Sequence, residues 1–153
     1  MSVTIFALAL MSTGLTLLHG VRSQDESALS SDAIRVVRDI FAEMQEIANQ
    51  PQDLGTYQGI SAIYEVYNGT KRGITGLPGG TVSIVVYANE TNVPAVLGGP
   101  QDMNYDGDAG DNLGGVAAGT DMQIVPVALT LTYTDERGPT TMTYYRRIAQ
   151  TRK

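Results

Sequence analysis

The amino-acid sequence predicts an α+β fold, in which a long N-terminal helix packs on an antiparallel sheet of about four strands. Three observations lead to this prediction: an uncharged apolar opening, a stretch with helical periodicity, and a second half in which alternating segments are separated by turns. The chain has 153 residues, of which 42% are hydrophobic, as expected for one ordinary domain. We therefore expect an apolar helix over residues 1–22 and one globular domain over residues 23–153.

The opening segment is the most apolar part of the chain. Residues 1–21 carry no charged side chain, and the first charge is Arg22. As a helix this segment is about 30 Å long, close to the hydrocarbon thickness of a bilayer. A signal peptide is one alternative, but its basic residue should precede the apolar run, and Arg22 follows it. A buried core helix is another, although it would need protein on every side. We expect residues 1–22 to form a membrane or assembly helix.

Residues 23–50 show the pattern of an amphipathic helix, with Pro51 as its stop. Apolar residues recur there at spacings of three and four, and charged residues occupy the other side. The stripe consists of Ala33, Val37, Phe41, Met44 and Ala48, and it is widened by Ile34, Ile40 and Ile47. One face of this helix is therefore expected to pack on the sheet.

The sheet is expected within residues 58–150. Turn signals and alternating apolar residues predict four strands there. The predicted strands are Ile60–Tyr67 before the Asn68-Gly69 turn, Thr81–Tyr87, Val125–Thr134, and Thr140–Ala149 after a turn at residues 135–138. The last two form an antiparallel hairpin with one face in the core.

Composition excludes several classes of function. The net charge is −6, which gives no electrostatic footprint for nucleic acid. The chain has no cysteine, and its one histidine, His19, lies in the apolar opening, so thiolate catalysis, a Ser-His-Asp triad and Cys/His metal clusters are absent. We expect no enzymatic activity, no nucleic-acid partner and no small-molecule substrate. A hydrolase that uses two carboxylates of the 102–111 loop stays an alternative.

The most chemically suggestive segment is an Asp/Gly-rich loop. Oxygen side chains at alternate positions with a permissive glycine can wrap a hard cation, so the loop predicts a calcium site. The candidate ligands are Asp102, Asn104, Asp106, Asp108 and Asp111. The start of the loop matches an EF-hand, but Leu113 occupies the position of the closing glutamate. The alternative is a solvated connection without an ion, because the same residues are common in turns.

Four segments together carry a resemblance to a known family. They are Val3-Thr4-Ile5-Phe6-Ala7-Leu8-Ala9-Leu10-Met11-Ser12-Thr13-Gly14-Leu15, Phe41-Ala42-Glu43-Met44, Leu77-Pro78-Gly79-Gly80-Thr81-Val82 and Val127-Ala128-Leu129-Thr130-Leu131-Thr132-Tyr133. The chain resembles the type IV pilin-like proteins, and more narrowly the minor pilins of type IV pili and the minor pseudopilins of type II secretion.

This resemblance implies a structural subunit. It would be a single-pass protein of the bacterial inner membrane with a periplasmic domain, extracellular once assembled into a pilus. Its partners would be other pilin or pseudopilin subunits, contacted through the N-terminal helix. The family has a leader that ends in glycine and a glutamate in the apolar helix, whereas Ser2 stands near the place of that glutamate. Either Met1 is internal to a longer gene product, which we expect, or the chain is a member without the glutamate.

A second interpretation belongs to another class of protein. The chain would be an exported soluble binding module that depends on calcium, and its apolar opening would be an atypical signal peptide. The two interpretations differ in the fate of residues 1–22, which are retained in the first and removed in the second.

Overall fold

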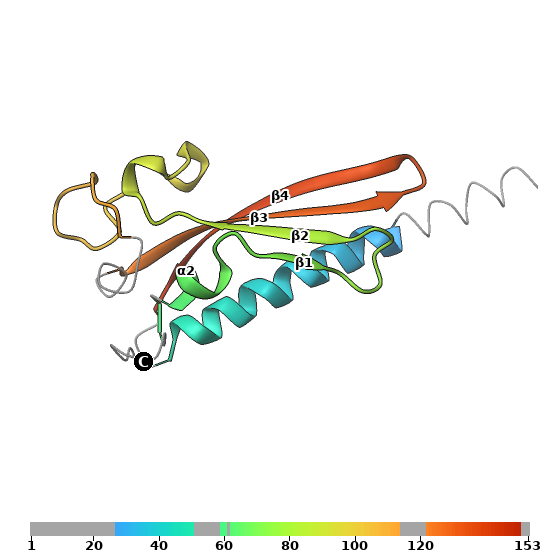
Figure 1. The fold of residues 1–153 in the computed structure, drawn as a ribbon, viewed down its shortest axis with the longest axis horizontal. Coiled ribbons are helices and arrows are strands. Elements are labelled where there is room, and N and C mark those ends of the chain that lie inside the picture. Colours follow the sequence, from blue (N-terminus) through green and yellow to red (C-terminus); the bar gives the residue numbers. More distant parts are fainter. Residues whose placement is uncertain (1–26, 51–58, 61, 114–121, 151–153) are drawn as a thin grey trace, which may run out of the picture.

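The computed structural model describes residues 27–50, 59–60, 62–113 and 122–150. It consists of a long helix and a four-stranded antiparallel sheet, with short helical segments in the connections (Figure 1). The elements are the helix over residues 27–48, α2 (Ala62–Tyr67), β1 (Lys71–Gly73), β2 (Thr81–Val86), the 3-10 helices η1 (Glu90–Asn92) and η2 (Ala95–Leu97), β3 (Ile124–Asp135) and β4 (Gly138–Ala149). The α+β prediction with four antiparallel strands is confirmed.

The predicted apolar helix over residues 1–22 and the predicted stop at Pro51 lie outside the described residues. Within the described ranges, no helix combines the length and the apolar character that crossing a bilayer requires.

The sheet has the simple strand order β1-β2-β3-β4. Its main unit is the hairpin of β3 and β4, which are paired without interruption from Ile124 opposite Ala149 to Asp135 opposite Gly138. Alternation along β3 places Leu129 and Leu131 fully in the core. The predicted hairpin is therefore confirmed, and so is the predicted strand over Thr81–Tyr87, of which β2 forms the greater part.

The long helix lies along one face of the sheet and buries the predicted stripe (Figure 1). All five stripe residues are buried, as is Ile40, and Ile47 is half-buried. Ile34 is 47% exposed, so its assignment to the core-facing stripe was wrong. Phe41 lies two turns further along on nearly the same side, where the guanidinium of Arg146 lies 5.6 Å from the centre of its ring. Periodicity gives the side of a helix but not how far the sheet covers that side.

The predicted strand over Ile60–Tyr67 was also wrong, because Ala62–Tyr67 forms the helix α2. Ile60, Ile63 and Tyr67 are buried, and their spacing of three and four is that of a helix. A short apolar run fits the two-residue period of a strand as well as the 3.6-residue period of a helix, and this segment folds as a helix. The Asn68-Gly69 turn is present, with Gly69 at φ 72°, and its N–H donates to Ile84 O at 3.0 Å.

The short edge strand β1 was not predicted by the sequence pattern. Its central residue, Arg72, connects it to two helices: the guanidinium lies 5.1 Å from the ring centre of Tyr67 in α2 and 3.7 Å from the carboxylate of Glu43 in the long helix. These contacts hold β1 against the helical layer.

Candidate functional site

The Asp/Gly-rich loop belongs to a long excursion between β2 and β3, which the structure describes over residues 87–113 (Figure 1). It lies at the end of the sheet opposite the tip of the β3–β4 hairpin. A bridge between Asn89 and Asn112 closes its base, and Leu113 N–H donates to Ala88 O at 2.7 Å. The loop is therefore anchored at both ends.

Glu90 is the residue that organises this loop. Its side chain is fully buried. Its Oε1 accepts the N–H of Met103 at 2.5 Å, and its Oε2 accepts the N–H of Asp111 at 3.0 Å. Its own N–H donates to Asp111 O at 3.0 Å, and its carbonyl accepts the N–H of Gln101 at 3.3 Å. One buried carboxylate thus connects both arms of the loop.

Sequence reasoning missed Glu90. The signal that could have found it is its position, because Glu90 continues the alternation of the buried residues Val86 and Ala88 and precedes a Gly/Pro-rich stretch. A carboxylate at such a place is shielded from water and must accept hydrogen bonds from nearby backbone.

The predicted ligands at the start of the loop shape the loop itself. Asp102 accepts the N–H of Tyr105 at 2.6 Å and that of Gly107 at 2.9 Å. Asp106 accepts the N–H of Asp108 at 2.9 Å and the side-chain amide of Asn104 at 3.0 Å. Tyr105 has φ 62° and Gly107 φ 97°, so the chain turns sharply between these acceptors. Such side-chain to backbone bonds are typical of Asx turns.

The acids of the loop are near enough to affect one another. Hydrogen bonds from the N–H of Asp108 and the amide of Asn104 lower the pKa of Asp106. Loss of hydration and then the charge of Asp106, with contributions from Asp108 and Glu90, raise the pKa of Asp111. The second half of the loop therefore concentrates negative charge around Asp111.

The described residues contain no group of three or more Asp, Glu, His or Cys side chains arranged to hold a metal ion. Leu113, at the position of the EF-hand glutamate, is only 5% exposed and belongs to the core. Asp102 and Asn104 accept backbone N–H groups within the turns of the loop. The charges of Asp106 and Asp108 act on Asp111. The calcium site stays a prediction, with these five residues as its candidate ligands.

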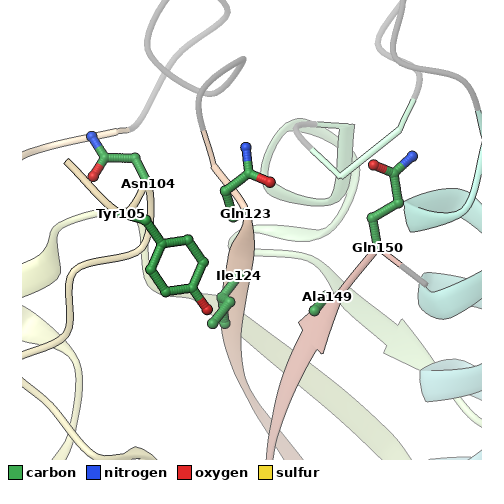
Figure 2. A pocket seen from close by; sticks show the side chains of 6 residues that line it. All are labelled: Asn104, Tyr105, Gln123, Ile124, Ala149 and Gln150. Carbon is green, nitrogen blue, oxygen red and sulfur yellow. The ribbon is translucent and has the colours of Figure 1, made fainter. Parts of the chain in front are cut away.

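Beside the loop lies an open hollow of about 550 Å³. Its lining is neutral and comes from the loop, the start of β3 and the end of β4, as Figure 2 shows. The lining residues are Asn104, Tyr105, Gln123, Ile124, Ala149 and Gln150. This lining contains neither a carboxylate pair nor a nucleophile with a base.

Comparison with protein-family models, with curated proteins and with solved structures found no match for this chain.

Proposed function

We propose that this chain is a minor pilin or pseudopilin, a structural subunit of a type IV pilus or a type II secretion-like filament. Residues 1–22 anchor it in the inner membrane before assembly and then pack against the same segment of neighbouring subunits. An apolar rod is costly in water but is stable in lipid or in a bundle of similar helices. The role is structural, so the proposal includes neither a reaction nor a small-molecule substrate nor nucleic acid.

The observation that supports this proposal best is the arrangement of the long helix on the sheet. The helix runs from the hairpin tip toward the far end, where Gln45 Nε2 donates to Ala149 O at 2.8 Å (Figure 1). The described part of the helix, which begins at Ser27, therefore has its N-terminal end on the hairpin side. In a membrane-anchored subunit the Asp/Gly loop, at the opposite end, would then lie far from this N-terminal end.

The proposal is tested by cross-linking in native membranes, which is simple because the chain has no cysteine of its own. We expect two copies of Ala7→Cys to form disulfide-linked dimers after mild oxidation, because small residues allow apolar helices to approach closely. The matched control is Thr75→Cys, in an exposed turn of the domain, which should stay monomeric. Equal cross-linking of both variants, or release of the Ala7→Cys chain without detergent, would contradict the proposal.

The second candidate is an exported soluble module that binds its partner in a calcium-dependent way. The feature that favours it is the loop held by Glu90, in which Asp106, Asp108 and Asp111 influence one another. This candidate requires removal of the apolar segment, and so detection of residues 3–21 in the mature protein would exclude it.

A further inference from the structure

Among the described residues, β4 is the last strand of the sheet and pairs on one side only, with β3. β4 has twelve residues paired with β3 in one register, without a bulge. The other edge strand, β1, has only three residues and begins with Lys71, a common form of edge protection. β4 contains no lysine, and its one proline, Pro139, lies near the hairpin tip. A long regular edge of this kind is a template for another strand.

The backbone groups at this edge follow from the register. Thr134 N–H donates to Pro78 O and Tyr87 N–H donates to Pro126 O, so even-numbered residues of β3 direct their backbone groups toward the β2 side. Odd-numbered residues of β3 therefore bond to β4, and their partners there are even-numbered. The backbone groups of Thr141, Thr143, Tyr145 and Arg147 consequently point away from β3. No hydrogen bond to these groups from any other described residue is found.

Side chains along the edge indicate what kind of strand would fit. Met142 and Tyr144 are half-buried and pack against the core, so they offer an apolar rim on the helix side. On the other side, Thr141 and Thr143 are exposed, and Tyr145 is 44% exposed. A matching strand has alternating apolar and hydroxyl-bearing residues.

The charges at the two ends of β4 indicate the direction in which an added strand would run. Arg146 and Arg147 are adjacent and exposed near the end of β4, and neither takes part in the two ion pairs formed among the described residues, Arg35–Asp32 and Arg72–Glu43. The acids Asp135 and Glu136 lie at the opposite end, next to the hairpin turn. Arg146 lies over the ring of Phe41, and neither arginine is neutralised in those two ion pairs, so this end of β4 carries local positive charge that is complementary to an acidic segment.

We propose that the edge of β4 binds an extended acidic peptide segment of a partner protein. The segment adds as an antiparallel fifth strand, pairs with the outward backbone groups of Thr141, Thr143, Tyr145 and Arg147, and places acids at its N-terminal end beside Arg146 and Arg147. This is β-strand addition, in which main-chain hydrogen bonds give affinity and side chains give specificity. The inference uses only β4 and its neighbours and is independent of the proposed function.

The probe is the synthetic peptide acetyl-Glu-Glu-Val-Ile-Thr-Ile-Thr-amide, titrated into the full chain in detergent and followed by NMR. We expect slower hydrogen exchange at the N–H groups of Thr143, Tyr145 and Arg147, and no change at Tyr144, whose N–H already bonds to β3. A peptide that begins with Lys-Lys should bind at least about tenfold more weakly, because it meets Arg146 and Arg147 with like charge.

Two variants at one position separate backbone pairing from side-chain contact. Thr143→Pro deletes an outward N–H that β3 does not use, and should abolish binding, whereas Thr143→Val retains the N–H and should bind normally.

Since the proline variant could fold poorly, Arg146→Gln with Arg147→Gln gives an independent test and should weaken binding of the acidic peptide. Equal binding of both peptides, no response at millimolar peptide, or outward N–H groups already protected in the free protein would overturn the proposal. Protection that rises with protein concentration would instead assign the edge to a second copy.

Discussion

Glu90 shows how one buried side chain determines a loop. A fully buried carboxylate is costly unless hydrogen bonds satisfy it, and Glu90 accepts the N–H groups of Met103 and Asp111. These two residues lie on opposite arms of the Asp/Gly loop, so the side chain of Glu90 links the arms in addition to the backbone bonds at the base of the loop. The positions of the candidate ligands Asp106 and Asp108 therefore depend indirectly on Glu90.

We predict that Glu90→Gln lowers the free energy of unfolding by about 1 to 3 kcal/mol, because its amide NH2 group would face a backbone donor and leave one N–H unsatisfied. Chemical denaturation of the full chain in detergent measures the change. Glu46→Gln, at an exposed position of the long helix, is the control and should leave stability within about 0.5 kcal/mol. A Glu90→Gln variant as stable as this control would show that the carboxylate does not hold the loop.

A second prediction concerns Asp111. Its pKa is raised in the folded state above the usual 3.8, so its ionisation opposes folding at neutral pH. Asp111→Asn cannot ionise and should raise the melting temperature at pH 7. The gain should shrink as the pH falls through the raised pKa and vanish below 3.8, where the parent side chain is protonated in both states.

Melting curves of the parent protein and of Asp111→Asn between pH 3 and pH 7 measure this difference in melting temperature. Asp39→Asn, on the exposed side of the long helix, serves as the control for the loss of one negative charge outside the loop. A lower melting temperature of Asp111→Asn at neutral pH would mean that the carboxylate makes a favourable contact instead.

At the scale of elements, the long helix is held by its core-facing stripe rather than by all of its apolar residues. Ile40 is 7% exposed, whereas Ile34 is 47% exposed. We predict that Ile40→Ala costs about 2 to 5 kcal/mol through lost burial and a cavity, and that Ile34→Ala costs about 0.5 kcal/mol or less. Denaturant unfolding of the two variants compares them directly. Equal costs would mean that the helix lies on the sheet in another rotation.

The Asp/Gly loop is the element on which calcium would act. If calcium binds, it neutralises repelling carboxylates and stabilises the folded state, so millimolar calcium should raise the melting temperature. The shift should disappear in Asp106→Ala and persist in Asp39→Ala. No shift of the parent protein at millimolar calcium would refute the calcium site.

Regular elements were predictable from the sequence where the pattern was long. The alternation along Val125–Thr134 and the periodicity of residues 27–48 each extend over several repeats, and both were predicted correctly. Ile60–Tyr67 is too short to distinguish a strand from a helix, and β1 (Lys71–Gly73) has no apolar or β-branched residue to mark it. Its pairing with β2 comes from the fold around it.

For the candidate site, the sequence allowed us to predict which residues are present but not how they are arranged. The acids of the loop could be identified from their spacing, but their hydrogen bonds could not, because Asp102 and Asp106 accept N–H groups whose direction depends on the sharp turns at Tyr105 and Gly107. The local position of Glu90 indicates an acid next to buried residues, but its hydrogen bonds to the two arms of the loop depend on residues distant in sequence, which the local pattern does not specify.

At the scale of the whole molecule, the helix and the sheet give the domain two distinct ends. The described part of the long helix begins near the hairpin tip, and the acidic loop lies at the far end (Figure 1). Under the proposed function this separation is useful, because an anchoring end and an exposed end would have different neighbours. The edge of β4 extends between the two ends of the domain, so a peptide strand could pair with it without contacting either end.

The most direct test of this account is the intact mass and N-terminal sequence of the protein isolated from its native membranes. The account predicts a membrane-bound chain that retains residues 3–21, with its N-terminus produced by cleavage after the glycine of a leader and then methylated. A soluble mature chain that begins near Ser23 would contradict it, because the apolar segment would then be a removed signal peptide and could not hold a filament together.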